Sequence, residues 1–259
     1  MYSGSLPIAT KWLLDAVGDV GRCAINSVCM IIAKETGQKG TGFLLRSGYI
    51  ITAFHVIEGC GLTNLFAIMS SGESIKFKGI IYDPLRDLAI LQPDKRIKGG
   101  LEIHSEKNVK VGMQVYTWGY PLGYNGPAPL LTVGFLSGFI ARKVDEKTVV
   151  KHLVVNSAFN PSNSGGPLFI SGRNEVVGVV VSKHLPMSRF VVSAIRALAE
   201  NRSGVVFKSV DDKGKERKFV ESQIVAEIFE TLQGLNPSSH WRSCSWIRSS
   251  ILPYRERNL

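Results

Sequence analysis

Residues 160–167 read Asn160-Pro161-Ser162-Asn163-Ser164-Gly165-Gly166-Pro167 and follow an apolar run that ends at Val155. The two glycines after the serine let the backbone approach a ligand closely, because glycine has no side chain and adopts conformations that other residues avoid. A tight turn here can aim successive N–H groups at one point, which is the geometry that stabilises an oxyanion. Taken alone, the stretch also fits an ordinary hairpin loop.

Two upstream segments supply the other parts of a hydrolytic site. The apolar run from Ile50 leads into a single histidine, His55, and Asp87 opens the strand-like run 88–91. A serine hydroxyl is a poor nucleophile at neutral pH and needs a base that is itself oriented by an acceptor. The chain order His, Asp, Ser is one in which such triads occur. We therefore expect Ser164 as nucleophile, His55 as its base and Asp87 as the group that fixes the His55 tautomer.

Other candidates for these roles are weaker. Asp83 lies four residues before Asp87 and competes with it as the acid. The remaining histidines stand in no motif and are expected at the surface or in loops; they are His104, His152, His184 and His240. The sequence contains no C-x-x-C, H-E-x-x-H, acidic calcium loop or P-loop, so we expect no metal and no other cofactor.

In these segments the chain resembles the trypsin-like serine proteases, most closely their Deg (high-temperature-requirement) branch. That branch carries T-A-x-H-V, D-L-A-[IV]-L and N-P-G-N-S-G-G-P blocks in this order. The corresponding blocks here are Thr52–Val56, Asp87–Leu91 and Asn160–Pro167, and Gly119–Gly123 resembles the family's G-[NY]-P-x-G turn. The D-L-A-I-L context favours Asp87 over Asp83. The resemblance covers roughly residues 22–200 and implies a serine endopeptidase that acts through an acyl-enzyme.

The fold class implied is all-β with small α additions, built as two six-stranded antiparallel β-barrels of the chymotrypsin and trypsin kind. The close-set strand-like runs with turns between them agree with this architecture. We expect an N-terminal segment over 1–22 that contains a short helix over 11–20. The first strand of the peptidase domain should follow from Ala24. The peptidase domain should span 23–204, with barrel one at about 23–100 and barrel two at about 101–193. His55 and Asp87 then belong to barrel one and Ser164 to barrel two.

The last part of the chain should form a basic extension over residues 205–259. Residues 205–210 and 218–220 flank a charged turn and predict a hairpin, and residues 221–233 space their apolar side chains like one helical face. The end, 236–259, could pack on the body, bind a regulatory partner or lie disordered. Because this end is short, we expect it not to form the PDZ domain that many Deg proteases carry. A strand at 190–193 and a helix at 194–201 would complete the peptidase core.

The resemblance also assigns the substrate-binding residues. Ala158, six residues before the serine, would lie at the base of the primary pocket, and Val180, Val181 and Ser182 would form the edge that pairs with the substrate backbone. No carboxylate lies near Ala158 in sequence, and a basic side chain there would bury an unpaired charge. We expect small or medium apolar residues before the cut bond.

Two residues beside the nucleophile depart from better-known relatives. The backbone N–H groups of Ser162 and Ser164 would form the oxyanion hole, but the family usually has glycine where this chain has Ser162. A serine there can hinder the required geometry if φ must be positive. The alternative hypothesis is therefore a catalytically silent or switchable binding module on the same fold. Trypsin-like zymogens become active when a freed N-terminal amine pairs with an acidic residue directly before the serine. This chain has Asn163 there, which cannot form that ion pair, so we expect activity without N-terminal processing.

Composition limits partners and location. The net charge is +10, from 31 basic and 21 acidic residues, which favours either a solvated surface or a polyanion partner. We expect a protein or peptide substrate, and nucleic acid is not favoured, because no nucleic-acid module interleaves aromatics with the charges. The sequence shows no secretory signal and no apolar run long enough to span a membrane. The four cysteines do not resemble a disulfide framework, so a cytoplasmic location is expected.

Overall fold

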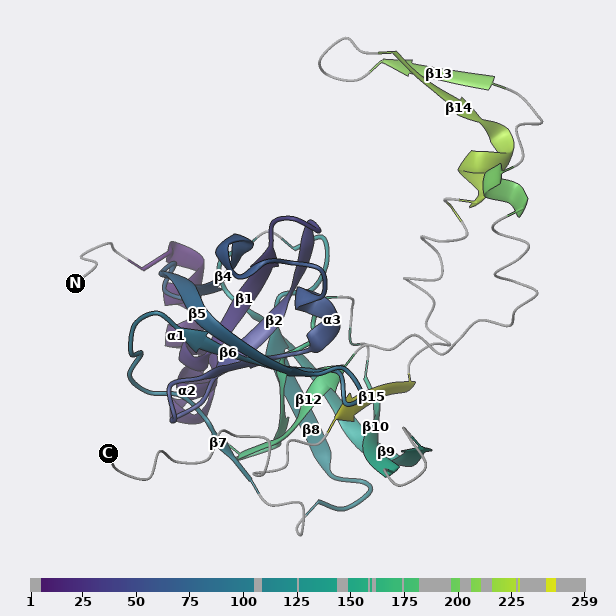
Figure 1. Cartoon of the computed structure of the whole chain (residues 1–259). Coiled ribbons are helices and arrows are strands. Elements are labelled where there is room, and N and C mark those ends of the chain that lie inside the picture. The colour runs from purple at the N-terminus through teal and green to yellow at the C-terminus, as the bar shows by residue number, and fades with distance from the viewer. Residues whose placement is uncertain are drawn as a thin grey trace. The chain divides into compact units, whose positions relative to one another are not determined.

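Figure 1 shows the computed structural model of the chain as a cartoon. The structure describes residues 6–104, 109–124, 126–143, 149–157, 159, 162–173, 175–181, 197–200, 206–210, 216–226, 228 and 241–245. The chain divides into two compact units, of which unit 1 contains residues 1–183 and 240–259 and unit 2 contains residues 184–239. Unit 1 holds the two barrels.

Two short helices precede the first strand of unit 1. They are α1 (Ile8–Ala16) and α2 (Asp19–Ser27). The sequence predicts a single helix over 11–20 and a strand from Ala24, so the helical region is longer at both ends than expected. Ala24 and Ile25 are fully buried on α2. A short apolar run of this kind fits a buried helix as well as a buried strand, which explains the difference.

Six antiparallel strands close into the first barrel. They are β1 (Val28–Ala33), β2 (Gln38–Leu44), β3 (Ile50–Thr52), β4 (Leu65–Met69), β5 (Ser74–Asp83) and β6 (Leu88–Pro93), in the order β1-β2-β3-β6-β5-β4. Buried and exposed positions alternate along the first half of β5, as expected of a strand with one face in the core. Helix α3 (Phe54–Ile57) follows β3, and the short 3-10 helix η1 (Leu62–Asn64) precedes β4.

The second barrel also closes through six antiparallel strands. They are β8 (Gln114–Gly119), β9 (Leu130–Lys143), β10 (Val149–Asn156), β11 (Pro167–Ile170), β12 (Glu175–Val181) and β15 (Trp241–Ser245). Pairing runs β8-β9-β10-β15-β12-β11, and β11 pairs again with β8. The two-residue strand β7 (Glu102–Ile103) adds to β12 in parallel. The predicted fold class, all-β with two six-stranded antiparallel barrels and few helices, is confirmed.

The sixth strand of the second barrel comes from a segment that the sequence analysis placed in a C-terminal extension. Strand β15 lies between β12 and β10, with Cys244 opposite Val180 on one side and opposite Leu153 on the other. Unit 2 is therefore inserted between β12 and β15, and residue 205 does not separate a body from an extension. The sequence of β15, W-R-S-C-S, has too few apolar residues to identify it as a strand. The strand expected at 190–193 lies outside the described residues.

Unit 2 contains the expected hairpin. Its strands β13 (Val206–Val210) and β14 (Glu216–Val220) pair antiparallel, with Val206 opposite Val220. Residues 197–200, 221–226 and 228 are helical, and the Gln223 side chain donates a hydrogen bond to the carbonyl oxygen of Ala199 at 3.4 Å. The hairpin and the start of the 221–233 helix are confirmed, whereas residues 229–233 lie outside the described part of the chain.

An apolar cluster packs the two barrels against each other. Barrel one contributes Phe43, Ile51 and Ile90, and barrel two contributes Trp118, Phe169 and Val179. Each of these side chains is at most 4% exposed, and burying one such side chain stabilises a fold by about 1.5–3 kcal/mol. The barrels therefore form one packed body, which fixes the residues of one barrel relative to those of the other.

Candidate active site

Asp87 contacts His55 at two points. The Oδ2 atom of Asp87 lies 2.8 Å from Nδ1 of the His55 ring, and its Oδ1 atom accepts the backbone N–H of His55 at 2.9 Å. The carboxylate can only accept hydrogen bonds, so Nδ1 carries the proton and Nε2 of the neutral ring is left as an acceptor. The Asp87 side chain is 4% exposed and the His55 side chain is 38% exposed. An imidazole that is oriented through one ring nitrogen, with the other nitrogen available as an acceptor, is suited to act as a base.

Local structure explains how these two residues meet. His55 lies on α3 directly after β3, and Asp87 lies in the turn before β6, which pairs with β3. The N–H of Phe54 donates to the carbonyl oxygen of Asp87 at 3.2 Å, which joins the helix to the turn. Asp87 has a φ of 57°. This left-handed conformation is uncommon, but aspartate adopts it more readily than most residues.

Asp83 has a different role in the turn. Its Oδ1 atom accepts the backbone N–H groups of Leu85 and Arg86 at 3.0 and 3.1 Å. Its Oδ2 atom forms an ion pair with the Arg86 guanidinium. These are the contacts of a residue that stabilises a β-turn through its side chain. Of the two candidate acids, Asp87 is the one that the structure places against the histidine.

The turn that carries Ser164 is anchored to both barrels. The N–H of Thr41, on β2, donates to the carbonyl oxygen of Ser164 at 2.8 Å. On the other side, Gly165 N–H donates to Val180 O at 2.7 Å, and Val180 N–H donates to Gly166 O at 2.8 Å. Ser164 is 2% exposed. The backbone position of the serine is therefore fixed by strands from two different barrels.

Gly165 brings this turn against the segment that carries the histidine. A Cβ atom added at Gly165 would lie 2.0 Å from the carbonyl oxygen of Thr41 and 2.8 Å from the backbone nitrogen of Ala53. Gly165 also has a φ of 88°, which favours glycine. Because Ala53 lies two residues before His55, the structure brings the backbone beside Ser164 next to the start of α3.

Ser162 has a φ of 72°, the left-handed conformation that its non-glycine identity makes unfavourable. An L-residue in this conformation costs roughly 1–2 kcal/mol relative to the right-handed one. The Thr41 hydroxyl donates to the carbonyl oxygen of Ser162 at 2.7 Å, which offsets part of that cost. The positive φ that would make a serine unfavourable at this position is thus present, together with a hydrogen bond that holds it.

Asn163 is buried without a hydrogen bond to its side chain. It is 1% exposed, and neither amide atom has a partner among the described residues. A Cβ atom added at Gly119 would lie 2.7 Å from Asn163 Oδ1, so the absent side chain at Gly119 makes room for this amide. A neutral amide is tolerated in such a place far better than an ionised carboxylate would be.

The substrate-binding residues expected from the resemblance are only partly described. Ala158 and Ser182 lie outside the described residues. Val180 and Val181 are fully buried, and both backbone polar groups of Val180 bond to the Gly165–Gly166 turn. Val181 lies opposite Ser243 of β15. The expectation that Val180 offers a free edge to substrate is therefore wrong, because this residue anchors the serine turn.

Thr41 is a site residue that the sequence analysis missed. It is fully buried and bonds to Ser162, Ser164, Thr52 and Tyr120 through its backbone and hydroxyl groups. Its two neighbours are glycines, and a Cβ atom at Gly40 would lie 2.5 Å from Val56 Cγ1. Glycine inside a strand marks a place where another part of the chain approaches closely. The Gly-Thr-Gly run was thus the available signal.

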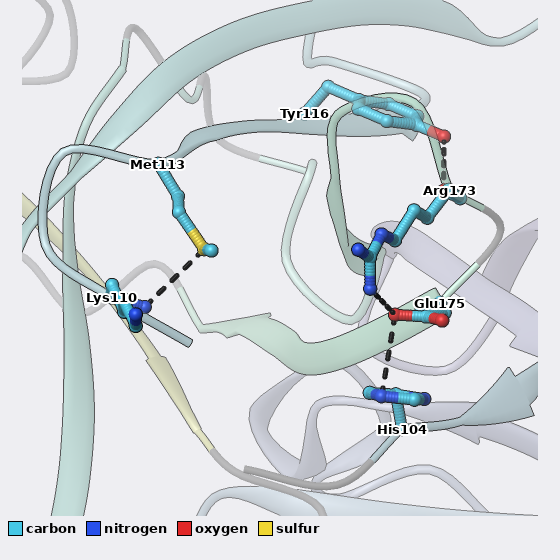
Figure 2. Close-up of polar contacts among 6 residues, drawn as sticks. All are labelled: His104, Lys110, Met113, Tyr116, Arg173 and Glu175. Atoms are coloured by element: carbon cyan, nitrogen blue, oxygen red, sulfur yellow. Dashed lines mark hydrogen bonds and ion pairs between the residues drawn. The ribbon is translucent and has the colours of Figure 1, made fainter. Parts of the chain in front are cut away.

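A second polar cluster lies around the turn between β11 and β12. Figure 2 shows His104 and Arg173 on either side of Glu175, with His104 Nε2 and Arg173 Nη1 each 3.5 Å from Glu175 Oε2. The Tyr116 hydroxyl donates to the carbonyl oxygen of Arg173 at 3.1 Å, and burial raises the pKa of Tyr116 to about 12. These contacts fasten the β11–β12 turn.

The other histidines are not uniformly at the surface. His104 is partly exposed, as expected, but His152 on β10 is 4% exposed. Exposure alternates along this part of β10: Lys151 is exposed, whereas Val150 and His152 are buried. His152 therefore lies on the face of the strand that is turned toward the interior. Within the described ranges, no three His, Cys, Asp or Glu side chains are grouped so that they could hold a metal ion.

Curated relatives of known name match part of this chain. A protein named "Probable periplasmic serine endoprotease DegP-like" from Pseudomonas savastanoi pv. phaseolicola is 33% identical over 147 residues, which are 56% of this chain and 29% of that protein. A protein of the same name from Halomonas elongata is 32% identical over 149 residues, which are 57% of this chain and 30% of that protein. The chain thus spans less than a third of the length of these relatives.

The names of these relatives contradict the expected cytoplasmic location. They describe periplasmic proteins and point to the periplasm rather than the cytoplasm. The expectation depended on thiols that looked unpaired, and Cys23, Cys29 and Cys60 are indeed free. Free thiols do not exclude an oxidising compartment, because oxidation also requires two sulfurs within bonding reach. Among the described helices, none combines the length and the apolar character needed to cross a bilayer.

Solved protease structures share the fold. The active form of the Rv3671c protease from M. tuberculosis has a TM-score of 0.54 and 24% identity, over 63% of this chain and 73% of that one. The HtrA-type protease AlgW with a tripeptide has a TM-score of 0.55 and 18% identity, over 74% and 67% of the two chains. Deg5 has a TM-score of 0.52 and 25% identity, over 70% and 92%.

The family model described as "Trypsin-like peptidase domain" matches residues 40–179, which is more than half of the chain. The matched region includes α3 with His55, the turn with Asp87 and the turn with Ser164. The enzyme class that the motifs predict, a serine protease, is confirmed at the level of the family. On this match, and on the barrels that hold the matched residues together, the chain belongs to the trypsin-like peptidase domain family.

Proposed function

We propose that this chain is a serine endopeptidase in which Ser164 attacks the peptide carbonyl, His55 accepts and returns the proton, and Asp87 holds the His55 ring. The observation that carries the proposal is the double contact of Asp87 with His55, at 2.8 and 2.9 Å. It leaves Nε2 of His55 as the acceptor that a nucleophilic hydroxyl requires. The family match over residues 40–179 supports the same assignment.

The proposed reaction has two steps that use the same residues. In the first, His55 takes the Ser164 hydroxyl proton as the oxygen bonds to the carbonyl carbon, and then gives it to the leaving amine, which produces an acyl-enzyme. In the second, a water molecule attacks the ester carbon while His55 accepts a proton from it, and His55 then gives this proton to the Ser164 oxygen as the ester bond breaks and the acid product leaves. The protonated ring formed in each step is stabilised by the Asp87 carboxylate, which stays ionised.

The negative oxygen that forms in each step needs donors held in advance. We assign this role to the backbone N–H groups of Ser162 and Ser164. Support comes from the anchored turn, since Thr41 fixes the carbonyl oxygens of both residues at 2.7 and 2.8 Å. Donors that need not reorganise during the reaction stabilise a developing charge much more than water does.

For the substrate we propose peptides with small or medium apolar residues before the cut bond. This follows from Ala158, six residues before Ser164, and from the lack of an acidic residue near it in sequence. An arginine or lysine side chain would be buried there without a counter-ion, which is unfavourable by several kcal/mol.

A second candidate is a catalytically silent or switchable binding module for a protein or polyanion. Two observations favour it: the strained φ of 72° at Ser162 and the net charge of +10. A partner could bind the basic end of the chain, residues 246–259. Loss of polyphosphate binding when these residues are removed from an otherwise unreactive protein would support this candidate.

Cleavage-site profiling on an unbiased peptide library tests both candidates. The wild-type chain should cut many peptides after small or medium apolar residues, and the Ser164→Ala chain should cut none. Cleavage concentrated after arginine or lysine would contradict the proposed preference for apolar residues but would still support the peptidase activity. A folded wild-type chain that cuts no peptide would reject the peptidase and favour the binding module.

A further inference from the structure

Ser162 poses a structural question that the triad does not answer. In the proposed mechanism its N–H is one of two oxyanion donors, yet it stands in the left-handed conformation, with φ at 72°, without being glycine. Something must hold the residue there, since a serine left to itself would favour other conformations. If the residue relaxed, the direction of its N–H would change, because φ sets the relation between the peptide planes on its two sides.

The Thr41 hydroxyl is the described group that holds Ser162. It donates to the carbonyl oxygen of Ser162 at 2.7 Å and accepts the backbone N–H of Tyr120 at 3.0 Å. A hydroxyl has a single proton to donate. Since Tyr120 uses one of the acceptor sites of the oxygen, the proton is directed to Ser162, and the orientation of the hydroxyl is fixed from both sides.

The rest of Thr41 leaves the hydroxyl little freedom. The residue is fully buried; its N–H donates to Ser164 O at 2.8 Å, and its carbonyl oxygen accepts the Thr52 hydroxyl at 2.8 Å. A Cβ atom at Gly119 would lie 3.0 Å from Thr41 Oγ1, and one at Gly166 would lie 3.2 Å from Thr41 Cγ2. Both sides of the threonine side chain are therefore closed by backbone.

The geometry points to Thr41 as the positioning residue of the oxyanion hole, whose hydroxyl keeps Ser162 in the left-handed conformation that glycine would adopt unaided. Thr41 N–H and Oγ1 together hold the carbonyls of Ser164 and Ser162, the two residues whose N–H groups are the assigned donors. This inference rests on the proposed function. It adds a residue on barrel one that controls a donor on the serine turn without contacting the substrate.

Kinetics of hydroxyl-deletion variants test the inference. Thr41→Val removes the hydroxyl at nearly constant shape, and Thr41→Ser keeps it. Removing an oxyanion donor lowers kcat by about 10²–10³-fold, and displacing one should cost less. We expect Thr41→Val to lower kcat by about 10–100-fold with KM changed less than threefold, and to weaken a peptide boronate, which mimics the transition state, by a similar factor. Thr41→Ser should stay within about threefold of wild type in both.

A matched control separates positioning from general stability. Thr10, on α1, is also fully buried, and its hydroxyl donates to the carbonyl oxygen of Ser70 at 2.9 Å. Thr10→Val should also lower the melting temperature, by less than Thr41→Val because it leaves one buried carbonyl unpaired rather than a carbonyl and an N–H, while kcat and boronate binding stay unchanged. A second check is Ser162→Gly, in whose background Thr41→Val should lower kcat by a smaller factor, because glycine needs no support in this conformation.

Each remaining outcome is decisive. Wild-type kcat and boronate binding in a folded Thr41→Val protein would overturn the role of Thr41 and leave the peptidase proposal intact. Loss of folding in Thr41→Val and Thr41→Ala, with Thr10→Val folded, would overturn it too, because the hydroxyl would then be a structural requirement of the barrel. If the wild-type chain cuts no peptide and binds no boronate, the proposed function itself fails, and Thr41 has no oxyanion hole to position.

Discussion

Asp87 accepts two hydrogen bonds from His55, one from the ring and one from the backbone, at 2.8 and 2.9 Å. The ring contact fixes which nitrogen carries the proton, and the backbone contact fixes where the helix begins. With one carboxylate holding both, the ring direction and the chain direction of His55 are set together. This arrangement stands in the part of the chain, residues 40–179, that matches the trypsin-like peptidase family.

Replacing Asp87 by asparagine should lower kcat by about 10³–10⁴-fold, because the amide can donate to Nδ1 and so favour the wrong tautomer of His55. The initial rate of peptide hydrolysis measures this. Asp83→Asn is the matched control, since Asp83 contacts Leu85 and Arg86 in the same turn and not the ring. It should keep the rate within a few-fold. Equal losses of rate in the two variants would show that disruption of the turn, and not loss of the Asp87–His55 contact, lowers the activity.

Ser162→Gly should stabilise the fold by about 1 kcal/mol, because glycine adopts a φ of 72° without strain. Ser162→Val should destabilise it by more than that, since a β-branched residue fits this conformation poorly. Urea unfolding midpoints, measured in a Ser164→Ala background to avoid self-cleavage, give both values. A Ser162→Gly protein less stable than its parent would mean that the serine side chain makes a compensating contact.

Gly165→Ala should abolish hydrolysis and destabilise the fold. The added methyl would lie 2.0 Å from Thr41 O, and φ is 88°. Gly172→Ala is the control: φ is 78°, but no atom lies within 4 Å of the added methyl. The control should lose about 1–2 kcal/mol from backbone strain alone, and Gly165→Ala a further 1–3 kcal/mol, roughly, from overlap. Similar unfolding midpoints for the two would contradict the close approach of the two barrels at Gly165.

The thiols should differ sharply in reactivity. Cys23 is exposed, whereas Cys29 is fully buried in barrel one, and burial raises the pKa of the Cys29 thiol well above its usual range. Because the thiolate is the reactive form, Cys29 should resist iodoacetamide at pH 8 until the protein unfolds. Peptide mapping after timed alkylation checks this. Early modification of Cys29 in the folded protein would contradict the core position of β1.

The sequence predicts the site better than the substrate pocket, for physical reasons. His55, Asp87 and Ser164 each stand in a short block whose residue types and order resemble those of the family, so the sequence alone could propose them as a triad, and the structure brings His55 and Asp87 into contact. Thr41 could not, because a threonine within a strand becomes important only through contacts with residues about 120 positions away, such as Ser162. Val180 was misassigned because its backbone bonds depend on the fold of the turn that follows Ser164.

The strands likewise divide into those that the sequence predicts and those that only the fold reveals. Alternating or continuous apolar runs identify most of both barrels, since burial of one or both faces dictates that pattern. Strand β15 escaped notice because W-R-S-C-S carries no such pattern and takes its place through pairing with β10 and β12. The helical state of Ala24 and Ile25 was missed because apolar burial alone does not distinguish a short helix from a strand.

Labelling with a fluorophosphonate, followed by mass spectrometry of the modified peptide, tests the central claim most directly. The reagent bonds only to a serine that an adjacent base activates, and it occupies the oxyanion hole once bound. The wild-type chain should carry one adduct, on Ser164; Ser164→Ala should carry none, and His55→Ala should react at least about 10²-fold more slowly. A folded wild-type chain that remains unlabelled at Ser164, or that is labelled there equally fast without His55, would contradict the account.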